Sequence, residues 1–77
     1  MEKIIEQLAA RYGQQIKQIL KIDKAELSIF LNKDVDALQF SQKLQDQIVA
    51  QIDEFTIYQI NIVDAAGKVI DKFATNQ

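Results

Sequence analysis

The chain has 77 residues, of which 48% are apolar and 26% are charged, and nine basic against eleven acidic side chains give a net charge of −2. It contains no histidine, cysteine, proline or tryptophan, and only two glycines. These absences exclude a Cys–His or Ser–His nucleophile pair, a thiolate or imidazole metal site and a glycine-rich phosphate loop. Because the two charge signs are interspersed, electrostatics predicts neither nucleic-acid binding nor binding to a membrane surface.

The length predicts a single small domain over residues 1–77, with residues 73–77 as a frayed tail. A chain of this size buries only roughly 60% of the surface that its unfolded form exposes. Without cysteines, the core or an oligomer partner must supply the stability that disulfides often supply in small secreted domains. The charged pair Glu2-Lys3 stands where an apolar signal segment would begin, and no apolar run approaches the roughly 18 residues of a membrane span. We therefore expect a cytoplasmic protein.

The first segment, from Glu2 to Lys21, carries apolar residues at the three-and-four spacing of one helix face. These residues are Ile4, Ile5, Leu8, Ala9, Tyr12, Ile16, Ile19 and Leu20. Gly13 interrupts the pattern and costs about 1 kcal/mol relative to alanine inside a helix. Because the periodicity continues through Gly13 without a phase slip, we expect one helix over this segment. The alternative is a helix that ends at Gly13 as its C-cap, followed by a second short helix from Gln14.

The next segment, Ala25 to Leu31, alternates apolar and polar residues with the period of two that is typical of a half-buried strand. Asn32-Lys33-Asp34 then supplies turn residues. Asp36 is placed to cap a second helix, with Gln39 completing a capping-box pair, and Asp34 is an equally allowed cap. We expect this helix to run to about Asp53.

The third segment, Phe55 to Asp64, is rich in β-branched and aromatic residues and predicts a strand with Tyr58, Ile60 and Ile62 on one face. Residues 64–68 form a hairpin signal in which Gly67 favours positive φ. A short strand over residues 69–73 follows.

The predicted fold is therefore α+β, with the order α-β-α-β-β. The first two strands flank a helix and can pair in parallel, whereas the last two form an antiparallel hairpin. Both helices then cover one face of a three-stranded mixed sheet, which gives a two-layer sandwich.

No group of side chains in this sequence predicts catalysis. Asp34 and Asp36 flank a helix start, where capping explains them better than a metal site, because Ca²⁺ or Mg²⁺ needs more oxygen ligands and usually a glycine in the loop. Tyr12 and Tyr58 lie among apolar positions and are expected to fill the core. We expect no enzyme activity, no cofactor and no bound metal.

The face of the sheet opposite the helices is expected to be unusually apolar. Phe30 of the first strand and Ile57 and Val63 of the second lie there if the helices cover the alternate residues. In the last strand, Asp71 would share a face with Val69 and Phe73, and a buried carboxylate is costly. We therefore expect Ile70 to face the helices and Val69 and Phe73 to lie on the open face.

Apolar residues gathered on an open sheet face usually mark an interface. The predicted interface consists of Phe30, Ile57, Val63, Val69 and Phe73. The leading functional hypothesis is a non-catalytic protein–protein interaction or assembly domain that acts through this face or through a sheet edge and forms a homo-oligomer.

From Leu27 to Ala66 the order of strand, acidic turn, helix and β-rich strand resembles the core of the alkaline-shock-protein family, the ring-building domains of secretion machinery and the amino-terminal domain of ribosome maturation factors. The resemblance covers about half of the chain and rests on hydrophobic pattern, so it assigns no family. It implies, as the alternative hypothesis, a module associated with RNA or the ribosome. The GxxG clamp of the KH-type RNA-binding module is missing, and the net charge of −2 makes nucleic acid a poor partner.

Overall fold

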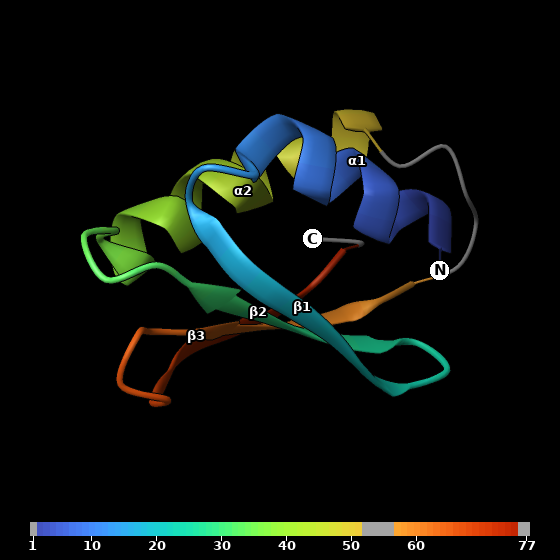
Figure 1. The fold of residues 1–77 in the computed structure, drawn as a ribbon. Coiled ribbons are helices and arrows are strands. Elements are labelled where there is room, and N and C mark those ends of the chain that lie inside the picture. Colours follow the sequence, from blue (N-terminus) through green and yellow to red (C-terminus); the bar gives the residue numbers. More distant parts are fainter. Residues whose placement is uncertain (1, 52–56, 76–77) are drawn as a thin grey trace.

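The computed structural model describes residues 2–51 and 57–75. Its elements, in chain order, are α1 (Glu2–Tyr12), β1 (Ile16–Asp23), β2 (Glu26–Leu31), α2 (Ala37–Gln51), β3 (Gln59–Val63) and β4 (Val69–Ala74). The strands form one sheet in the order β1-β2-β3-β4, in which the central pair is parallel and the two outer pairs are antiparallel. Both helices lie over the same face of this sheet (Figure 1). The α+β class, the mixed sheet and the two-layer arrangement are confirmed, but the sheet has four strands and the order is α-β-β-α-β-β.

The fourth strand is β1, which replaces the second half of the predicted long helix. Helix α1 ends at Tyr12, and the chain turns through Gly13 into β1, which pairs with β2. A Cβ built on Gly13 would lie 2.6 Å from the carbonyl oxygen of Ala9, so the turn needs glycine for steric reasons. Neither one helix over residues 2–21 nor a second helix from Gln14 is correct.

A bulge explains why β1 looked helical. Ile16 pairs with Leu31 and Ile19 pairs with Ile29, although the two isoleucines are three residues apart on β1 and their partners are two apart on β2. Lys17 is therefore an extra residue, and a bulge of this kind places residues i and i+3 on the same face. Both isoleucines pack against the core from the helix side, which reproduces the spacing of a helix face in a strand.

Helix α2 begins as its cap predicts. Asp36 Oδ1 accepts a hydrogen bond of 3.2 Å from the Gln39 N–H, and the Asp36 carbonyl accepts one of 2.9 Å from the Phe40 N–H. Asp36, and not Asp34, is therefore the N-cap. The predicted end at Asp53 and the start of the next strand at Phe55 lie outside the described residues.

The side chains of strand β4 are distributed over the two faces of the sheet differently from the prediction. Ile60 pairs with Phe73 and Ile62 with Asp71, but Val63 pairs with Val69, so Ile70 is an extra residue. This bulge breaks the alternation between Val69 and Phe73, which in a regular strand would share a face. Ile70 packs against the core as expected, whereas Phe73 is 3% exposed and belongs to the core on the helix side. The placement of Phe73 on the open face is wrong.

The turn before β4 and the residue after it are held by hydrogen bonds. Asp64 Oδ1 accepts bonds from the N–H groups of Ala66 and Lys68, and Gly67 adopts φ of 87°, as predicted. The backbone N–H of Thr75 donates to the Tyr58 carbonyl, and the Tyr58 N–H donates to Thr75 Oγ1, each at 2.9 Å. Phe73 and Ala74 therefore end β4 and Thr75 is buried, so the expected fraying does not begin at residue 73, and residues 76–77 of the predicted tail lie outside the described residues.

The core lies between the helices and the sheet. Its buried apolar members are Ile4, Leu8, Leu27, Ile29, Leu31, Ala37, Phe40, Leu44, Tyr58, Ile60, Ile62 and Phe73. Tyr12 packs against this cluster and meets the Phe40 ring edge-on, with ring centres 5.4 Å apart, so both tyrosines contribute to the core as predicted. Within the described residues, neither helix has the length and apolar character needed to cross a membrane.

Candidate functional site

The face of the sheet opposite α1 and α2, here called the open face, is covered by no described element (Figure 1). Residues that pair directly across neighbouring strands point to the same face, so the registers define its rows. The apolar row consists of Gln18, Phe30, Val63 and Val69. The middle row consists of Leu20, Ser28, Asn61 and Lys72. The acidic row consists of Asp23, Glu26, Gln59 and Ala74.

Exposed apolar side chains are concentrated on the sheet. Among the described residues, five large apolar side chains are exposed: Leu20 (39%), Ile22 (53%), Leu38 (52%), Ile57 (52%) and Val69 (46%). Leu20 and Val69 lie on the open face, Ile22 is the extra residue of a second bulge in β1, and Ile57 lies just before β3. Only Leu38 belongs to a helix. Among the residues whose exposure the structure describes, the exposed large apolar side chains therefore lie mostly on or beside the sheet.

The apolar row adds Phe30 and Val63 to the apolar side chains of the open face. Val63 is only 3% exposed although no helix covers it, because Phe30 and Val69 flank it on the neighbouring strands. Phe30 is half-buried. The row is thus already packed side to side, and its exposed apolar surface comes from Phe30 and Val69.

A hydrogen-bonded polar group occupies the middle of the face. Asn61 Nδ2 donates to Glu26 Oε2 at 2.8 Å and to Ser28 Oγ at 3.2 Å. The carboxylate can only accept, so this contact fixes which end of the amide is nitrogen. Asn61 Oδ1 is buried and accepts no hydrogen bond from the residues that the structure describes. A buried oxygen without a partner loses the hydrogen bond that it would accept from water if it were exposed.

Both edges of the sheet carry features that oppose strand addition. Strand β1 has bulges at Lys17 and Ile22, and β4 has one at Ile70. Bulges and edge lysines such as Lys21 are common means of preventing edge-to-edge pairing. These features make the two sheet edges poorly suited to pairing with another strand.

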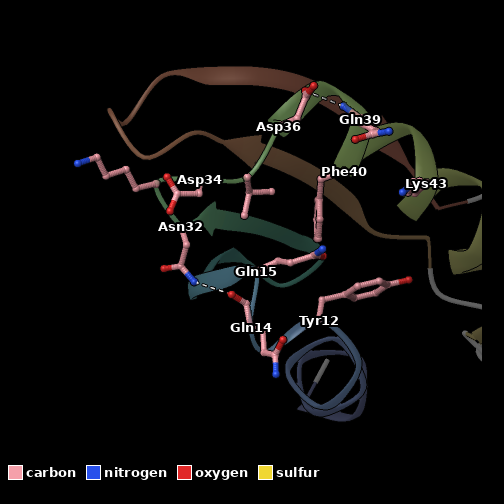
Figure 2. A pocket seen from close by; sticks show the side chains of 11 residues that line it. Tyr12, Gln14, Gln15, Asn32, Asp34, Asp36, Gln39, Phe40 and Lys43 are labelled. Atoms are coloured by element: carbon pink, nitrogen blue, oxygen red, sulfur yellow. Dashed lines mark hydrogen bonds between the residues drawn. The ribbon is translucent and has the colours of Figure 1, made fainter.

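A cavity of about 630 Å³ lies where the α1–β1 turn meets the loop before α2 (Figure 2). Its polar groups already hold the fold together: Asn32 Nδ2 donates to the Gln14 carbonyl at 3.0 Å, and Asp36 caps α2. The Tyr12 hydroxyl donates to Gln47 Oε1 at 2.6 Å. No three metal-ligating side chains gather anywhere in the described part of the chain. The hydrogen bonds at this cavity therefore join the α1–β1 turn to the loop before α2 and Tyr12 to α2.

The structure brings three of the five predicted interface residues together. Phe30, Val63 and Val69 are direct neighbours in the apolar row. Ile57 is exposed beside β3, and Phe73 lies on the opposite face in the core.

Sequence reasoning missed Leu20 and Ile22, because Leu20 was expected on a helix that ends at Lys21 and Ile22 lies between that helix and the next predicted strand. The available signal was the β-branched density of Ile16, Ile19 and Ile22. A scan against protein-family models and searches among curated proteins and solved structures find no match to this chain.

Proposed function

We propose that this chain is a non-catalytic protein–protein interaction domain and that the open face is its docking surface. The observation that carries the proposal is the position of the exposed apolar side chains. Leu20 and Val69 lie on the one sheet face that the helices leave uncovered, and Ile22 and Ile57 lie beside it. Apolar side chains gathered on one uncovered sheet face are typical of interfaces, whereas singly scattered apolar residues are ordinary.

The polar pattern of the face also supports a docking role. The apolar row lies beside the middle row, which carries polar and charged groups, including Asn61 and Lys72. Protein interfaces likewise combine apolar contact surface with polar groups around it. The charges at the rim would select among partners, and the apolar row would supply most of the binding free energy.

The test compares two lysine substitutions at similarly exposed apolar positions. Val69→Lys places a charge on the open face, and Leu38→Lys places one on α2, which lies on the other side of the sheet. Both variants are expected to keep the circular dichroism spectrum and the unfolding midpoint of the wild type. The wild type and the two variants are each immobilised, and the proteins that each of them binds are eluted and compared. Amide hydrogen exchange of the wild-type protein is then measured in its free and bound states.

We expect Val69→Lys to abolish binding and Leu38→Lys to leave it intact. Bound wild-type protein should show slower amide exchange in β1 and β3. Equal binding by the two variants, or protection confined to the helices, would contradict the open face as the docking surface.

A further inference from the structure

We draw no further inference here: the strongest candidate, the identity of the partner that docks on the open face around Leu20 and Val69, carries none, because nothing in the structure shows what covers this face.

Discussion

The Ser41 hydroxyl of α2 donates a hydrogen bond of 2.7 Å to Oδ2 of Asp71 on β4. Asp71 pairs with Ile62 and therefore points to the helix side, where a carboxylate is costly unless it is hydrogen-bonded. Gln45 Nε2 gives the same oxygen a second bond of 3.1 Å, and the Lys72 N–H donates to the other oxygen at 2.9 Å. The carboxylate is thereby satisfied and joins the helix layer to the edge of the sheet.

Ser41→Ala should lower the free energy of unfolding by about 1–2 kcal/mol, because it removes a hydrogen bond to a charged group from a fully buried position. Urea denaturation measures this change. A double-mutant cycle with Asp71→Ala should give a coupling of about 1 kcal/mol or more. Gln42→Ala, at an exposed position on α2, is the control and should change stability by less than about 0.5 kcal/mol. Additive losses in the cycle would mean that the two residues do not act together.

Asp36 and Asp34 provide a matched comparison of two acidic residues near one helix start. Asp36→Ala should cost about 1 kcal/mol, because it removes the acceptor for the Gln39 N–H, whereas Asp36→Asn should retain most of the stability. Asp34→Ala should be close to neutral, because the hydrogen bond to the Gln39 N–H is accepted by Asp36 and not by Asp34. Chemical denaturation of the three variants is the measurement, and equal losses for the two alanine variants would contradict the assignment of Asp36 as the cap.

Local signals made most of the second half of the fold predictable. The cap at Asp36, the alternation of Tyr58, Ile60 and Ile62, and the hairpin glycine at Gly67 each depend on a few neighbouring residues, and the structure confirms all three. The open face was partly predictable for the same reason, since Phe30 and Val63 follow from alternation in two regular strands.

The fold predictions failed at two bulges and at one turn that contains neither glycine nor asparagine. The bulge at Lys17 gave Ile16 and Ile19 a helical spacing, and the bulge at Ile70 moved Phe73 to the other face. Among the described residues, only Gly67 adopts a positive φ. The turn at Lys24 and Ala25 therefore closes without one, and this hairpin has no glycine or asparagine that would have indicated it in the sequence. A bulge depends on how a strand pairs with its neighbour. The periodicity of one segment of sequence contains no information about this pairing.

Gly13 is predicted to be intolerant of any side chain. Gly13→Ala would place a Cβ against the Ala9 carbonyl oxygen, so the turn between α1 and β1 must shift. We expect a loss of about 1–2 kcal/mol in the free energy of unfolding, more than the gain that alanine gives by restricting the unfolded chain. Thermal unfolding followed by circular dichroism measures it. A stabilised Gly13→Ala variant would favour a helix that continues through residue 13.

The two faces of β4 can be distinguished by their response to truncation. Phe73→Ala should cost about 3–5 kcal/mol, because Phe73 is buried against the core and its removal leaves a cavity. Val69→Ala, at a position that is 46% exposed, should cost less than about 1 kcal/mol.

Because a loss of that size can unfold a small domain outright, Phe73→Leu serves as the milder variant. It should still destabilise the protein more than Val69→Ala does, as measured by the urea midpoint. A regular strand without the bulge at Ile70 would place both side chains on the open face and make both changes mild. Comparable midpoints for Phe73→Leu and Val69→Ala would therefore contradict the bulge, and with it the composition of the open face.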